Sequence, residues 1–363
     1  MKATQQLHEL GQSLWLDNIT RALLTSGTLS RYLREFAVTG LTSNPTIFDQ
    51  AIQSAGLYDD AIREKAAAGK SGEALFFELA FEDLTRAADL FRPIHDATDG
   101  TDGWVSLVVS PLLADDSAGT VKAAVELHAR ARRRNLFIKI PGTRAGATAI
   151  EEAIFAGVPV NVTLLFSREH YVAAAEAYLR GIERRLAAGR DPCVGSVASL
   201  FVSRWDVAVK DKVPAELRNR LGIAVAMRTY KAYRELLASP RWLKLAAAGA
   251  RPQRLLWVST GTKDPTAADV LYVEGLAAPA TVNTMPEKTL LAFADHGKVT
   301  GAMRLDGGNA EAVLAEFVHA GINIDALAVD LQREGAKAFA TSWSDLLDRI
   351  ASKSVSLTRA KRA

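Results

Sequence analysis

The sequence predicts an α/β protein that folds as a (β/α)₈ barrel of the TIM type with extra helices. Eight short apolar runs alternate with longer segments rich in Ala, Leu, Glu and Arg. Apolar runs of this kind are typical of parallel strands that helices cover. The chain contains neither a GxGxxG loop nor a GxxxxGK[ST] loop that would favour a nucleotide-binding sheet. Eight strand and helix pairs therefore favour a closed barrel over an open sheet.

The predicted elements follow one another in a regular order. Two long connections, 49–103 and 203–253, have a helical composition and are interpreted as decorations of the barrel. Ser167 is a predicted helix N-cap after the fifth strand, and Gly157 a predicted helix stop before it. Further helices are expected after about residue 300. The predicted strands are 14–18, 40–44, 104–110, 136–142, 158–166, 196–202, 254–260 and 279–284.

One domain is expected to span most of the chain. Residues 1–350 are predicted to form a single barrel domain. Residues 351–363 end in the basic run SKSVSLTRAKRA, which is predicted to be a frayed tail.

Composition and charge exclude several classes of protein. The chain has 363 residues, with 44 Lys and Arg against 41 Asp and Glu, and this small dispersed excess does not favour nucleic acid as a partner. The single cysteine, Cys193, excludes an internal disulfide and a thiolate metal site, which fits a reducing compartment. No apolar run approaches the ~20 residues of a membrane span, and the N-terminus lacks the apolar core of a secretory signal. We therefore expect a cytoplasmic protein without a membrane partner.

Lys139 is the most informative residue of the sequence. It lies in LFIKIPGT (136–143), where Leu136, Ile138 and Ile140 fall on one face of a strand and Lys139 on the other. Burying an ammonium group is expensive, so a chain keeps one when it pairs with a carboxylate or does chemistry. Burial also lowers the pKa of the amine and frees it to attack a carbonyl. The alternative is a structural lysine that reaches past the strand end or forms a salt bridge.

Other polar residues share the inward face with Lys139. Asp17 falls on this face of the first strand, Asn161 and Thr163 on that of the fifth, and Ser199 on that of the sixth. Several strands that each contribute polar side chains near their ends are what a barrel active site requires. The outward, apolar sets are Leu14 and Leu16 on the first strand, Val158, Val160, Val162 and Leu164 on the fifth, and Ala198, Leu200 and Val202 on the sixth.

Each of these polar residues also has a structural explanation. Asp17 could be a turn or cap residue, and Asn161 and Thr163 could fill a barrel layer by bonding each other. Ser199 is too common to be informative alone. A lysine, a carboxylate, an amide and hydroxyls on one face together indicate an imine-forming site.

Two cations are candidates for binding an anionic group. Arg204 follows the sixth strand and Lys263 follows the seventh, where barrels often bind phosphate. Arg can contact phosphate oxygens in a bidentate manner, whereas Lys acts as a point charge. The alternative for each is a solvated loop cation.

Five motifs together resemble the transaldolase family in their order and spacing, from about residue 13 to residue 350. The resemblance is to the longer bacterial form, and it implies a transferase of the pentose phosphate pathway. Such an enzyme moves a dihydroxyacetone unit from fructose 6-phosphate or sedoheptulose 7-phosphate to glyceraldehyde 3-phosphate or erythrose 4-phosphate. It needs no metal or organic cofactor, because the protonated imine is the electron sink. The motifs are GLTSNPTIF (40–48), LFIKIPGT (136–143), VPVNVTLLFS (158–167), SVASLFVSR (196–204) and LWVSTGTKDP (256–265), followed by DVLYVEGL and TVNTMPE.

The resemblance also implies roles for individual residues. Lys139 matches the Schiff-base lysine and Asp17 the general acid and base. Many members of the family carry arginine where this chain has Lys263, which keeps the charge but loses the bidentate fork. Family residues that hold the donor hydroxyls or orient water are matched by Asn44, Asn161, Thr163 and Ser199. The family's phosphate-binding cations are matched by Arg204 and Lys263.

Val108 is a departure from the family pattern. Transaldolases typically carry a glutamate on the third strand, in a motif resembling VSLEV, whereas this chain reads VSLVVSPLL. The glutamate positions the water that relays protons to and from the imine, and loss of such a group costs ~10²–10⁴ in rate. The alternatives are a slowed transaldolase, an impaired sugar-phosphate-binding relative, or a Schiff-base aldolase with another donor. The sequence does not indicate an oligomeric state.

Overall fold

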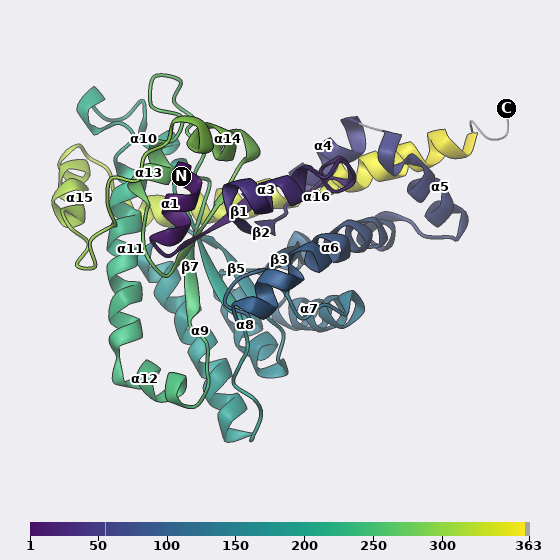
Figure 1. Cartoon of the computed structure of the whole chain (residues 1–363), viewed down its shortest axis with the longest axis horizontal. Helices are drawn as coiled ribbons and strands as arrows, with labels where there is room; N and C mark the ends of the chain where they lie inside the picture. The colour runs from purple at the N-terminus through teal and green to yellow at the C-terminus, as the bar shows by residue number, and fades with distance from the viewer. Residues whose placement is uncertain (55, 360–363) are drawn as a thin grey trace.

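The computed structural model describes residues 1–54 and 56–359, and in this part of the chain eight parallel strands close into a barrel in the order β1 to β8 (Figure 1). The predicted (β/α)₈ fold is therefore confirmed, and each predicted strand is present with ends that differ by at most two residues. The strands are β1 (Gln12–Asp17), β2 (Val38–Thr42), β3 (Val105–Val108), β4 (Leu136–Pro141), β5 (Val160–Leu165), β6 (Ser196–Phe201), β7 (Gln253–Val258) and β8 (Thr281–Met285).

Helices surround the barrel and fill both long connections, as predicted (Figure 1). Among residues 1–54 and 56–359, no single helix is long and apolar enough to cross a membrane. The first half of the chain contains α1 (Ala3–Glu9), α2 (Arg21–Thr25), α3 (Thr28–Phe36), α4 (Pro45–Ser54), α5 (Asp59–Ala67), α6 (Gly72–Ala97), α7 (Ser117–Ala131), α8 (Arg144–Ala156) and α9 (Arg168–Ala187). The second half contains α10 (Ser203–Val209), α11 (Leu221–Ala238), α12 (Pro240–Ala247), α13 (Leu271–Gly275), α14 (Glu287–His296), α15 (Ala310–His319) and α16 (Ile324–Arg359). Short 3₁₀ turns occur in both halves; they are η1 (Gly56–Tyr58), η2 (Pro111–Leu113) and η3 (Ala215–Leu217).

The two helix boundaries predicted around β5 are present. The Ser167 side chain accepts a hydrogen bond from the backbone N–H of His170 at 3.1 Å and caps α9. Gly157 ends α8 with a φ of 90°, a left-handed conformation that glycine adopts without a steric penalty. Both ends of the β5 segment are therefore fixed by local chemistry that the sequence contains.

Aromatic side chains fill the amino-terminal half of the barrel interior. Trp104 stacks on Phe137 with ring centroids 4.0 Å apart, and Trp15 lies 6.1 Å from Phe137. The indole of Trp15 donates to the Asp102 carboxylate at 2.8 Å. All four side chains are buried. This end of the axis is therefore packed, and its buried polar groups, Ser13, Asp102 and Arg254, bond to one another.

Leu164 departs from the strand alternation that the sequence suggested. Leu14, Leu16 and Val162 pack in the outer core as predicted, whereas Leu164 belongs to the inner cluster with Trp15. The prediction that Leu164 faces outward is wrong because its backbone has a φ of 63° and the β5–β6 register shifts after Val162. This β-bulge turns the side chain to the inner face.

Helix α16 continues beyond the point where the sequence suggested a tail. It runs without a break from Ile324 to Arg359 and extends alongside α4 and α5, away from the barrel (Figure 1). Lys353 donates to the Ile52 carbonyl at 2.7 Å and pairs with Asp59 at 2.6 Å. Lys353 thus holds this part of α16 on its neighbours, and the chain is helical as far as Arg359. Residues 360–363 of the predicted tail lie outside the described residues.

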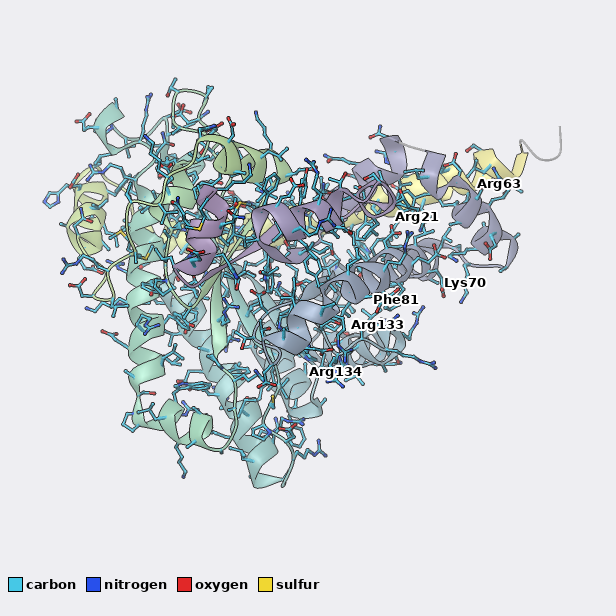
Figure 2. All side chains as sticks on the ribbon, viewed as in Figure 1. Arg21, Arg63, Lys70, Phe81, Arg133 and Arg134 are labelled. Atoms are coloured by element: carbon cyan, nitrogen blue, oxygen red, sulfur yellow. The ribbon has the colours of Figure 1, made fainter. Side chains whose placement is uncertain are left out.

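Several cations on and near α6 form ion pairs with carboxylates, and Figure 2 labels Arg21, Arg63, Lys70 and Arg133 among them. An exposed pair contributes only about 0–1 kcal/mol to stability. The pair of Arg21 with Asp83 differs from the others, because the Asp83 side chain is fully buried. The pairs are Arg21 with Glu82 and Asp83, Arg63 with Asp60, Lys70 with Glu78, and Arg133 with Asp89.

Gly40 is required by the close approach of two tryptophans to β2. A Cβ at this position would lie 2.7 Å from the backbone oxygen of Trp104 and 2.7 Å from the Trp15 ring. We predict that Gly40→Ala lowers the free energy of unfolding in urea by ~1–3 kcal/mol, because the buried rings have no space to move into. Gly56→Ala is the control, since the nearest atom to its Cβ would be 3.5 Å away. Equal effects of the two substitutions would contradict this explanation.

Candidate active site

The Lys139 side chain is buried near the carboxyl end of β4. In the barrel register Lys139 lies between Val108 of β3 and Asn161 of β5, and it is 3% exposed. Among residues 1–54 and 56–359, its Nζ donates one long hydrogen bond, 3.5 Å, to the Ser43 carbonyl, and it lies 5.9 Å from the centre of the Phe339 ring. The sequence-based prediction of an inward, buried lysine is thus met, and the amine has few polar contacts.

Burial governs the protonation of Lys139 and Asp17. It lowers the pKa of Lys139, against the attraction of Asp17, which acts in the opposite direction. Burial also raises the pKa of Asp17, and this effect outweighs the opposing attraction of Lys139 and the hydrogen bond from Thr42. Both neutral forms are therefore favoured. The site contains a nucleophilic amine and a carboxyl group that can exchange a proton.

Thr42 is a site residue that the sequence analysis missed. Its hydroxyl donates to Asp17 Oδ1 at 2.8 Å and lies 2.7 Å from the hydroxyl of Thr284. Thr42 and Thr284 are both buried. The signal that could have found Thr42 is its polar side chain within the second predicted strand, adjacent to Asp17 in the barrel register.

A hydrogen-bonded layer joins β3, β5 and β6 beneath Lys139. Asn161 donates to the Ser106 hydroxyl at 3.1 Å and accepts from the Ser199 hydroxyl at 2.7 Å. All three side chains are buried. Asn161 and Ser199 are therefore brought together as predicted, and their orientation is fixed by partners of the same layer.

Thr163 faces a small cavity beside Lys139. Its hydroxyl is buried and has no hydrogen-bond partner among the described residues. Val108, Leu164 and Phe339 form apolar walls of the same cavity. A buried hydroxyl without a partner next to an amine is a place where a polar ligand atom or a water would gain a hydrogen bond.

Helix α16 covers the carboxyl end of the barrel. Gln332 donates to the carbonyl oxygens of Gly142 at 3.1 Å and Leu164 at 2.8 Å, and Phe339 lies over Lys139. Helices after about residue 300 were expected around the outside of the barrel, but the contribution of α16 to the site was not predicted. Helical periodicity identifies an apolar stripe, but it does not say which part of a barrel the stripe covers.

Arg204 and Lys263 lie at the rim of the site. Arg204 is half-buried in α10, with Cζ 5.3 Å from the centre of the Phe201 ring. Burial lowers the pKa of Arg204, against the attraction of Glu334. Lys263 is exposed after β7 and is close enough to Asp17 to counteract the rise of the Asp17 pKa. Both cations are thus at the carboxyl end of the barrel, where the sequence suggested them.

Asn44 lies just after β2 and has a structural task. Its Oδ1 accepts a hydrogen bond from the backbone N–H of Ile47 at 3.0 Å, in the first turn of α4. The same residue is next to Ser43, whose carbonyl accepts from Lys139. Asn44 is therefore adjacent to the amine while its side-chain oxygen caps a helix.

The fold and the polar side chains at the strand ends define a (β/α)₈-barrel enzyme. Residues 14–350 match the family described as Transaldolase/Fructose-6-phosphate aldolase. Among curated relatives named Transaldolase, that of Thermobifida fusca is 46% identical over 356 residues, covering 96% of this chain and 97% of the relative. That of Saccharopolyspora erythraea is 45% identical over 354 residues, covering 95% and 96%, and that of Thiobacillus denitrificans is 42% identical over 358 residues, covering 96% and 100%.

The chain therefore belongs to the transaldolase/fructose-6-phosphate aldolase family. It is an enzyme, a transferase of the transaldolase type, and the substrates of this family are sugar phosphates. The resemblance that the sequence motifs indicated is thereby confirmed.

The coupling of Asp17 and Lys139 predicts a pH effect. Asp17 raises the pKa of Lys139, so Asp17→Asn should lower it further and leave the amine neutral at lower pH. We expect the pH profile of Lys139 labelling by formaldehyde and cyanoborohydride, followed by peptide mass, to move down by about one unit or more. Asp206→Asn, at a buried acid between α10 and α11, is the control. An unchanged or upward-shifted profile in Asp17→Asn would show that the two groups do not interact.

Proposed function

We propose that residues 1–350 form one catalytic domain that transfers a dihydroxyacetone unit through an imine on Lys139. The donors are fructose 6-phosphate and sedoheptulose 7-phosphate, and the acceptors are glyceraldehyde 3-phosphate and erythrose 4-phosphate. The observation that carries this proposal is the buried Lys139 amine, whose pKa is lowered by desolvation beside the Asp17 carboxyl group. Lowering the pKa of a lysine favours its neutral form, which is a nucleophile for a ketone.

In the first half of the reaction, Lys139 Nζ adds to the carbonyl carbon of the ketose phosphate. Asp17 gives its proton to the departing hydroxyl group, so that loss of water leaves a protonated imine on Lys139 and a carboxylate at Asp17. The imine then accepts the electron pair of the carbon–carbon bond that breaks. Asp17 takes the proton of the hydroxyl group on the leaving side, so that an aldose phosphate departs and an enamine stays on Lys139. Burial raises the pKa of Asp17, which favours a carboxyl group that can give a proton and take one back.

In the second half, the enamine carbon attacks the aldehyde of the acceptor and Asp17 returns the proton. Hydrolysis of the new imine releases the product ketose phosphate. Asn44, Asn161, Thr163 and Ser199 hold the donor hydroxyls or orient water. The unpartnered hydroxyl of Thr163 beside Lys139 supports this assignment.

Arg204 and Lys263 hold the substrate phosphate in this proposal. Arg204 is half-buried, and among the described residues no carboxylate lies within ion-pairing distance of its guanidinium group. A cation kept partly buried without a carboxylate is suited to an anionic ligand. Lys263 adds a second positive charge on the neighbouring loop, as a point charge without the bidentate geometry of arginine.

Trapping of the imine tests the assignment of Lys139. After incubation with fructose 6-phosphate and borohydride, we expect the intact mass to rise by one reduced dihydroxyacetone adduct, located by peptide mass on the Lys139 peptide. Lys139→Ala should abolish the adduct, because no other amine would be in position to attack the ketone. An unmodified Lys139 peptide together with a labelled lysine elsewhere would overturn the assignment.

We propose that the turnover of this transaldolase is low because Val108 stands where a glutamate is expected. The residue is paired with Lys139 in the barrel register and lines the cavity beside it. A glutamate at this position in the resembling motif positions the water that relays protons, and valine has no group for that task. Substrate binding and imine formation depend on other residues, so turnover falls while affinity is kept. Trapping without turnover would favour a second function, that of a sugar-phosphate-binding relative.

Restoring the carboxylate should raise turnover. We expect Val108→Glu to increase kcat by about one to three orders of magnitude in a coupled transfer assay, the usual worth of a positioned acid or base. Val108→Gln is the control, because it has the same shape but cannot exchange a proton. A folded Val108→Glu enzyme that gains nothing over Val108→Gln, or a wild-type chain as fast as an ordinary transaldolase, would contradict the role given to Val108.

A further inference from the structure

A carboxylate from a distant helix lies at the end of β3, near the position where Val108 has replaced an acid. Glu73, in the first turn of α6, accepts a hydrogen bond from the Ser110 hydroxyl at 2.6 Å. The same oxygen, Oε1, accepts from the Trp343 indole of α16 at 2.8 Å. Ser110 and Trp343 are buried, so each would lose its hydrogen bond at a cost if Glu73 were absent.

Trp343 lies one helical turn after Phe339, the residue over the Lys139 amine. Its ring packs edge-on against Phe76, with centroids 4.9 Å apart, and lies 5.8 Å from Phe77. Glu73 therefore fixes α16 at a point adjacent to its contact with the site. It also fixes the end of β3, because Ser110 is two residues after Val108.

Two polar contacts thus hold α16 on the barrel, on either side of Phe339. Gln332 bonds the carbonyl oxygens of Gly142 and Leu164 on the β4 and β5 side, and Trp343 bonds Glu73 on the β3 side. Between them, Phe339 closes the cavity beside Lys139. The helix is fastened at both ends of the segment that covers the amine.

We propose that Glu73 is a positioning residue that holds α16 closed over Lys139 and so favours transfer over hydrolysis. The inference rests on the proposed imine chemistry. The enamine on Lys139 has two fates. It can attack an aldehyde and form a carbon–carbon bond, or its carbon can take the proton held by Asp17 and return to the protonated imine. Water then adds to that imine and the carbon–nitrogen bond breaks, which releases free dihydroxyacetone and the neutral amine and returns a proton to Asp17. Closure by α16 limits the second fate by excluding water.

The test is the ratio of free dihydroxyacetone to transfer product, with fructose 6-phosphate as donor and erythrose 4-phosphate as acceptor. Glu73→Ala should raise this ratio about tenfold, the order expected when buried hydrogen bonds are lost. Glu73→Gln retains an oxygen that can accept both hydrogen bonds and should stay within about twofold of wild type. The control is Glu78→Ala, which removes an α6 carboxylate paired with Lys70 and Arg130 at the surface. The ratio is independent of a low overall rate, because both products arise from the same enamine.

Trp343→Phe is the second variant if Glu73→Ala does not fold, because it keeps the ring packing and removes one donor. It should also raise the ratio. An unchanged ratio in the folded variants, or an equal rise in Glu73→Gln and Glu73→Ala, would overturn the role of Glu73. Failure of the wild-type protein to form any borohydride-trapped adduct at Lys139 would instead overturn the proposed function.

Discussion

The Lys139 amine is buried, and an ammonium group removed from water is unstable unless it is paired or loses its proton. The surrounding structure must therefore either pair this group or favour its neutral form. Asp17 provides a partial partner on β1, and the Asn161 layer supplies polar surroundings that are already bonded to one another. The aromatic layer around Trp104 and Phe137 closes the barrel from below, and α16 closes it from above. Water is kept away from the amine on both sides, and this burial lowers the pKa of Lys139.

Strand alternation was enough to find Lys139 and Asp17, because the side to which a strand residue points is set by local geometry and the burial of its neighbours. It failed at Leu164, where the positive φ of the backbone reverses the alternation. A leucine in a sequence gives no sign of such a φ, because this residue type rarely adopts one. It also missed Phe339 and Glu73, whose importance comes from contacts between segments far apart in the chain. Fold class and the residues on the strands were therefore predictable, whereas the covering helix and its attachment were not.

Val108 illustrates how stability and catalysis can favour different residues at one position. The cavity it lines is largely apolar, and a carboxylate there would have to be desolvated or remain protonated. Valine packs in such surroundings without that cost, so the barrel is not weakened by the replacement. The family match covers residues 14–350, and the hydrogen-bonded layer of Asn161, Ser106 and Ser199 is present beside Val108.

The unbroken α16 gives the site a mechanical link to a remote surface. From Phe339 to Lys353 the helix rises about 20 Å, at ~1.5 Å per residue. At the far end, Lys353 and Arg349 attach it to α4 and to the residues that begin α5 (Figure 1). Because α16 is continuous, a change in how its outer end packs reaches Phe339 through the turn that contains Trp343, which is bonded to Glu73. Sequence changes among α4, α5 and the outer half of α16 can thus alter access to the lysine without touching the barrel.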